Sequence, residues 1–141
     1  MNYQFHIEHL YIIRKRLLSY LEDTNLEKQL IIPKGCNNNM LWQIGHCVVS
    51  QQRLMYSLSG LPINVSDSYS ANFKIGSSPK DWLETPDIEE VKTRLANDHE
   101  KIQCIVSNNL IDGSIAFGQT QQPKLWDYAD NVDTLAFLSK I

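Results

Sequence analysis

Histidine side chains are the residues of this sequence best suited to chemistry. There are four of them: His6, His9, His46 and His99. Neutral imidazole is a common ligand of zinc and nickel, and a catalytic site for such a metal uses about three protein ligands and one open position. His6, His46 and His99 fall in three different predicted helices, and two of them, His6 and His99, lie on apolar stripes. The pattern therefore allows a three-histidine metal site in a helical bundle, and individually hydrogen-bonded core histidines are the simpler alternative. His9 lies at the edge of its stripe, so we expect it to be exposed.

The cysteines do not add to such a site. The three of them, Cys36, Cys47 and Cys104, show no CxxC spacing and do not form an even disulfide set. Cys47 directly follows His46, but successive residues of a helix point about 100° apart and do not face each other. We therefore expect Cys47 and Cys104 to be small buried hydrophobic residues in a reduced chain.

Two further residues are candidates for the lining of a pocket. Arg53 follows His46 by seven residues, which is about two helical turns along the same face. It could bind an anionic group of a substrate at the mouth of a pocket, or it could pair with a surface carboxylate. Trp42 could line the same pocket or fill the core. The sequence contains no GxSxG, P-loop, HExxH or Rossmann glycine motif.

Helical periodicity predicts the elements that would position these residues. Apolar residues recur at helical spacing in four segments. The predicted helices cover residues 3–22, 40–59, 85–108 and 132–141, and the connections cover 26–36, 61–84 and 110–131. The stripe of the first helix is Leu10, Ile13, Leu17 and Leu21, with Arg14 outside it. The sequence thus predicts one all-α domain over residues 1–141, a four-helix bundle with long crossover connections and a short fourth helix.

Local residues mark several of the expected helix ends. Asn39, with the two asparagines before it, is a good N-cap for the second helix, and Thr85 with Pro86 predicts the start of the third. Ser78 and the proline after it predict a short turn that leads to Trp82. Gly45 inside the second helix costs about 1 kcal/mol relative to alanine, so it indicates the close approach of another helix.

The composition and net charge of the chain exclude several classes of protein. The chain has 141 residues, 43% of them hydrophobic and 21% charged, with a formal net charge of −3. These values exclude a disordered tail and a sequence-wide basic surface for nucleic acid. No apolar run approaches the roughly 20 residues of a membrane span, and the N-terminus lacks the pattern of a secretion signal. We therefore expect a cytoplasmic protein without nucleic-acid or membrane partners.

The order Asn39, Trp42, Gly45, His46, followed by the segment 58–62 (Leu-Ser-Gly-Leu-Pro), resembles the DinB-like superfamily, a family of the metal-dependent hydrolase type. The segments 73–77, 82–86 and 131–138 extend this resemblance over nearly the whole chain. The resemblance implies an up-down-down-up four-helix bundle that forms a homodimer. It also implies a nickel or zinc ion held by three histidines, one of which matches His46, and the activity of a thiol transferase or hydrolase.

The sequence departs from that family at the other two ligands. The family places them as a His-x-x-x-His pair in the fourth helix, whereas this chain has no histidine after His99 and ends at Ile141. The resemblance therefore supplies one ligand, His46, of the three. Two functions follow from this: a metal-dependent enzyme with an incomplete site, or a non-catalytic bundle that dimerises or binds a small molecule and holds no metal.

Overall fold

The computed structural model describes residues 3–57 and 62–107, with side chains for residues 8–57 and 62–97, and within these ranges every regular element is a helix. Three helices are long: α1 (Tyr3–Asp23), α3 (Met40–Met55) and α5 (Ile88–Ser107). Two are short, α2 (Leu26–Leu30) and α4 (Asp67–Phe73), and a 3-10 turn, η2, covers Pro79–Asp81. The predicted all-α class is confirmed for this part of the chain. The predicted fourth helix at 132–141 and the connection at 110–131 lie outside the described residues.

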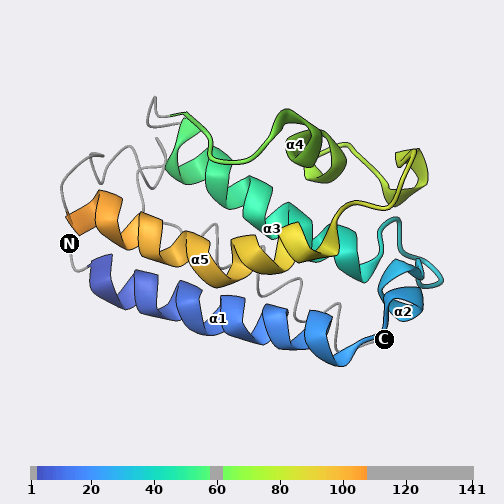
Figure 1. Cartoon of the computed structure of the whole chain (residues 1–141), viewed down its shortest axis with the longest axis horizontal. Helices are drawn as coiled ribbons and strands as arrows, with labels where there is room; N and C mark the ends of the chain where they lie inside the picture. The colour runs from blue at the N-terminus through green and yellow to red at the C-terminus, as the bar shows by residue number, and fades with distance from the viewer. Residues whose placement is uncertain (1–2, 58–61, 108–141) are drawn as a thin grey trace.

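The long helices pack side by side (Figure 1). α1 lies along α5, α3 packs against α5, and α4 lies against the outer side of α3. The short α2 packs against α3 at the end where that helix begins. α3 therefore has neighbours on several sides, which explains why its sequence is apolar around most of its circumference.

Polar side chains fix where the helices begin. Asn39 caps α3, because its Oδ1 accepts a hydrogen bond from the backbone N–H of Trp42 at 2.8 Å. Its Nδ2 also donates to the carbonyl of Leu30 at 3.3 Å, so the same side chain joins the end of α2 to the start of α3. Ser78 caps η2 as predicted. α5 begins at Ile88, and Asp87 rather than Thr85 accepts from a first-turn N–H, that of Glu89, at 2.9 Å.

Other element boundaries differ from the prediction. α3 ends at Met55 instead of continuing to residue 59. α2 and α4 lie in stretches that the sequence indicated as connections, and each begins with a polar cap, Asn25 for α2 and Ser66 for α4. Helices this short show too little periodicity to be recognised from apolar spacing, and tertiary contacts stabilise them.

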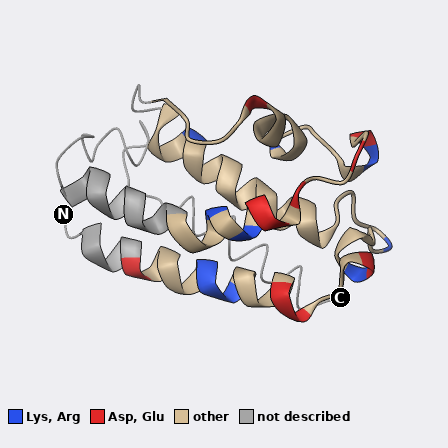
Figure 2. Ribbon diagram, viewed as in Figure 1, with Lys and Arg blue, Asp and Glu red and all other residues tan. Residues whose placement is uncertain are grey.

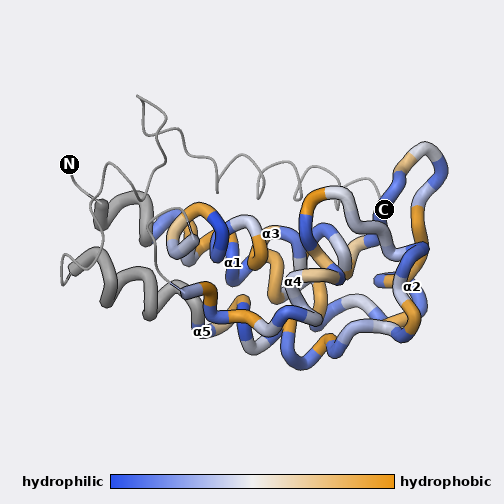
Figure 3. The backbone as a smooth tube through the Cα atoms, turned by 90° about the horizontal axis from the view of Figure 1, so that it is seen from above, coloured by the Kyte–Doolittle hydropathy of each residue, from blue (hydrophilic) through white to orange (hydrophobic). Residues whose placement is uncertain are grey.

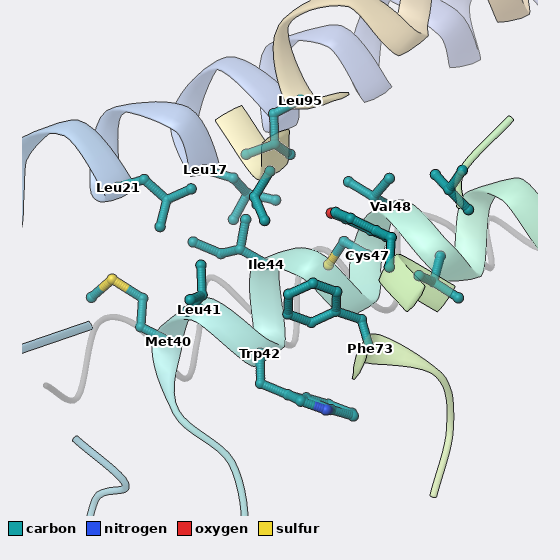
Figure 4. Packing of buried hydrophobic residues seen from close by; sticks show 14 residues of the cluster. Leu17, Leu21, Met40, Leu41, Trp42, Ile44, Cys47, Val48, Phe73 and Leu95 are labelled. Atoms are coloured by element: carbon teal, nitrogen blue, oxygen red, sulfur yellow. The ribbon is translucent and has the colours of Figure 1, made fainter. Parts of the chain in front are cut away.

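The core lies between α1, α3, α4 and α5 (Figure 4). Its fully buried side chains include Leu17 and Leu21 from α1, Ile44 from α3 and Phe73 from α4. In the coloured parts of the long helices, apolar and polar residues follow one another along the backbone tube, as expected for amphipathic helices (Figure 3).

Two positions carry the close packing. A Cβ added to Gly45 would lie 2.5 Å from Cδ1 and Cε1 of Phe73, so the glycine admits an aromatic ring of α4. This confirms the close approach that the sequence predicted. The prediction that Arg14 lies outside the inner stripe of α1 is wrong, because its side chain is only 3% exposed. Its Nη2 donates to the carbonyl of Cys47 at 2.8 Å and to Oε1 of Gln51 at 2.7 Å, and these bonds allow an arginine to lie on the inner face.

Candidate functional site

A cleft of about 480 Å³ lies beside α3, on the side that faces the end of α4. Its lining from α3 is His46, Val49, Ser50, Arg53 and Leu54, and its lining from the segment after α4 is Lys74 and Ile75. The α3 residues recur at intervals of three and four, so they form one face of that helix. The volume falls within the range of small-molecule pockets.

His46 is held by hydrogen bonds at both ring nitrogens. Its Nδ1 lies 2.7 Å from the backbone carbonyl oxygen of Phe73, and its Nε2 lies 3.2 Å from Oγ of Ser50. A carbonyl oxygen can only accept, so the proton resides on Nδ1 and Nδ1 donates. In the neutral ring Nε2 is then the acceptor, and the hydroxyl of Ser50 donates to it.

The ring of His46 also rests on an aromatic neighbour. Its centroid lies 4.6 Å from that of Trp42, and the two planes differ by 9°, which is a stacked arrangement. Trp42 is itself fixed, because its Nε1 donates to Oγ of Ser77 at 2.9 Å. The imidazole is thus restrained on one face and at both nitrogens, which favours a single orientation in the cleft.

The segment that brings Phe73 and Lys74 to the cleft is tied down by side chains. The hydroxyl of Ser77 lies within hydrogen-bond distance of the carbonyls of Asn72 (2.9 Å) and Lys74 (2.8 Å). Nε1 of Trp82 also donates to the carbonyl of Asn72, at 3.1 Å. The wall of the cleft opposite α3 therefore depends on the two tryptophans and one serine as well as on core packing.

The mouth of the cleft is positively charged. Arg53 and Lys74 are exposed there, and neither forms an ion pair with another described residue. The ion pairs within the described ranges, Lys92 with Glu89 and Arg94 with Glu90, both lie on α5. Basic and acidic segments both occur along the other described elements (Figure 2). Arg53 and Lys74 thus place two cations that have no described ion-pair partner beside one cleft, in a chain whose net charge is −3.

The predicted site residues lie at different places in the structure, and only some of them line the cleft. His46 and Arg53 line the cleft together. Trp42 lies against the His46 ring and is buried, so it supports the cleft from behind. His6 lies in α1 and His99 in α5, but both side chains are outside the described set. The expectations for Cys47 and His9 are confirmed: the first is 2% exposed in the core, and the second is exposed.

Sequence reasoning did not predict Ser50, Lys74 or Phe73 as site residues, although the segment 73–77 contributed to the family resemblance. The spacing of Ser50, one helical turn after His46, was a signal that could have identified it. No comparable signal existed for Lys74 or for the carbonyl of Phe73, since both depend on where the unpredicted α4 packs.

Residues 9–108 match the model of the DinB superfamily. The chain belongs to the DinB superfamily. The match runs from α1 to the residue after the end of α5 and so covers every described helix in whole or in part. Neither a comparison with curated proteins nor one with solved structures gave a match. No helix among the described residues of this DinB-superfamily chain is long and apolar enough to cross a membrane.

The three-histidine metal site that the family resemblance implies was tested against the described side chains. They contain no group of three or more histidine, cysteine, aspartate or glutamate residues arranged to hold a metal ion. Among its described lining residues, the cleft contributes one histidine, cysteine or carboxylate donor for a metal, Nε2 of His46, and the hydroxyl of Ser50 already bonds to it. The described donors of this DinB-superfamily chain therefore do not fit a three-ligand site by themselves.

Proposed function

We propose that this DinB-superfamily protein is a small-molecule enzyme of the transferase or hydrolase type, and that its cleft binds an organic anion next to the Nε2 atom of His46. The observation that carries the proposal is the composition of the cleft. It combines an oriented imidazole, two exposed cations and an apolar wall formed by Val49, Leu54 and Ile75.

The charges indicate which part of a ligand would lie where. Arg53 and Lys74 attract a carboxylate, sulfonate or phosphate to the mouth, since neither is neutralised by a described carboxylate. The apolar wall suits a hydrocarbon body. A ligand held at both places would present its middle to His46, whose Nε2 can accept a proton from it or from Ser50.

Calorimetric titration with a matched pair of ligands tests this proposal. We expect hexanoate to bind and hexanol, which lacks the charge, to bind at least several-fold more weakly. Arg53→Gln and Lys74→Gln should each weaken hexanoate binding by about threefold, because exposed charge pairs contribute less than about 1 kcal/mol. Lys80→Gln, which removes an exposed cation of η2 that is absent from the cleft lining, is the control and should bind as the unmodified protein does. Equal affinity for the two ligands would contradict the proposal.

A metal-dependent enzyme is the second candidate, and one observation favours it. Histidines that bind metals usually donate their other ring N–H to a backbone carbonyl or carboxylate, and Nδ1 of His46 donates to the carbonyl of Phe73. His46 would be one ligand, and the remaining ligands would come from residues beyond the described side chains, with His6 and His99 as candidates. When bound, nickel or zinc would act as a Lewis acid for the substrate.

Elemental analysis after incubation with nickel or zinc and removal of the excess distinguishes the two candidates. Stoichiometric metal that is lost in His46→Ala, and retained in the control His9→Ala, would support the metal-dependent enzyme. Protein that retains no metal would exclude the metal-dependent enzyme, and the anion-binding enzyme would remain as the candidate. We also propose a homodimer, which the resemblance to the family supports, and light scattering on the intact chain would test it.

A further inference from the structure

Ser50 has an unusual hydrogen bond for a serine inside a helix. Such serines commonly donate back to the carbonyl four residues earlier. The hydroxyl of Ser50 instead bonds to a side chain four residues earlier, at Nε2 of His46, and this is the hydrogen bond that the structure gives it. Ser50 is 9% exposed and lines the cleft, so its oxygen is sheltered but reachable from the cavity.

The hydroxyl, the imidazole and a fixed acceptor form a chain of three groups. The O–H of Ser50 points to Nε2 of His46, and Nδ1–H of His46 points to the carbonyl of Phe73. Serine is activated for acyl transfer when its hydroxyl is hydrogen-bonded to a base and a third group orients that base. Here the third group is a neutral carbonyl. It fixes the tautomer but stabilises an imidazolium less than a carboxylate does, so we expect slow turnover.

We infer that Ser50 is a nucleophile and His46 its general base, in the hydrolysis of esters whose acyl part carries an anionic group. The inference rests on the proposed function, because the anion subsite at Arg53 and Lys74 would hold the acyl part with its carbonyl carbon near Ser50. The positive potential of the same two side chains would stabilise the oxyanion that forms during attack.

The reaction would proceed in two balanced steps. Oγ of Ser50 attacks the ester carbonyl while its proton moves to Nε2 of His46. The bond from the carbonyl carbon to the alcohol oxygen then breaks, and the alcohol leaves with that proton. In the second step water attacks the acyl-serine and gives a proton to Nε2. The serine oxygen leaves, takes the proton back, and the free acid is released.

Two assays on the intact protein test this inference. The first is labelling with a fluorophosphonate, located by mass spectrometry of peptides. The second is hydrolysis of the 4-nitrophenyl monoester of glutaric acid, compared with 4-nitrophenyl butyrate, which lacks the anionic group. We expect the label on Ser50 and faster hydrolysis of the anionic ester. Ser50→Ala should abolish the label, and His46→Gln should slow labelling by about a hundredfold, the usual contribution of a general base. The control is Ser19→Ala, which removes an exposed hydroxyl of α1 and should react as the unmodified protein does.

The hexanoate titration separates this inference from the proposed function. Ser50→Ala leaves Arg53 and Lys74 in place, so it should still bind hexanoate, and that binding also demonstrates that the variant is folded. If the unmodified protein binds hexanoate but takes no label at Ser50, the assignment of Ser50 as the nucleophile is wrong, whereas the proposed anion site is supported. If Ser50 is labelled without hexanoate binding or a preference for the anionic ester, the nucleophile stands and the anion site is wrong. Equal labelling of Ser50→Ala and the unmodified protein would also overturn the inference.

Discussion

Gly45 offers a test of how tightly α4 is held against α3. Replacing it with alanine would place a Cβ 2.5 Å from Cδ1 and Cε1 of Phe73 and 2.7 Å from Cγ. Carbon atoms in contact are separated by about 3.5 Å or more, so the ring would have to move by about 1 Å. Phe73 is fully buried. It packs edge-on against Trp82, with ring centroids 5.7 Å apart, and its ring is tilted against that of Tyr69, with centroids 4.8 Å apart. It therefore has little room to move.

Two opposing contributions set the expected magnitude. Alanine is the better helix former by about 1 kcal/mol. Overpacking costs about 1–3 kcal/mol, and contact with three atoms of an immobile ring places Gly45→Ala at the upper end. We therefore expect a net loss of about 2 kcal/mol in the free energy of unfolding. With a urea m-value of about 2 kcal/mol/M, the midpoint would fall by about 1 M.

Urea titrations of a double-mutant cycle provide the measurement and its control. In a Phe73→Leu background the smaller side chain leaves room for the new Cβ, so Gly45→Ala should cost much less there. The coupling energy should be about 1 kcal/mol or more. If Gly45→Ala is as stable as the unmodified protein, or if its cost is the same in both backgrounds, the proposed contact between Gly45 and Phe73 does not limit stability.

Three further predictions concern residues around the site. Arg14 is buried, and its Nη1 has no acceptor among the described residues. Arg14→Met should therefore stay within about 1 kcal/mol of the original stability, whereas Arg14→Ala, which leaves a cavity, should lose about 3 kcal/mol in urea titrations. Equal losses would show that the guanidinium bonds matter more than packing. Asn39→Ala should lose about 1–2 kcal/mol, since it removes the α3 cap, and Asn39→Ser should recover most of it; no loss would contradict the capping role. Trp42→Phe keeps an aromatic ring near His46 but removes the bond to Ser77, so thermal unfolding should occur a few degrees lower, and ligand affinity should fall because the cleft wall loosens.

The sequence predicted the long helices well, because their patterns are local. Leu17 and Leu21 repeat at helical spacing, and Asn39 has the chemistry of a cap, so α1 and the start of α3 follow from neighbouring residues. Gly45 predicted a close approach, although not that the partner would be a ring of a separate short helix. Arg14 was misjudged because a charged residue is normally exposed, and acceptors from α3 that are distant in sequence allow its burial.

The candidate site was predictable only in its α3 half. His46 and Arg53 share one face of a helix, and regular geometry is enough to bring them together. The other half depends on α4, a helix of seven residues whose position is set by tertiary packing. For this reason the tautomer of His46 and the place of Lys74 could not be derived from spacing.

The stack of Trp42 on His46 provides the protein with its own optical reporter. An indole in face-to-face contact with an imidazole, at 4.6 Å, responds in its emission to whatever binds or protonates that ring. Of the three tryptophans in the chain, Trp82 and Trp126 would add background. A Trp126→Phe variant would remove one of them and keep Trp82, whose Nε1 donates to the carbonyl of Asn72 at the cleft wall, so changes caused by a ligand would be read against the emission of Trp82. Ligands for the cleft could then be screened by fluorescence without a label, a known substrate or an assay of activity.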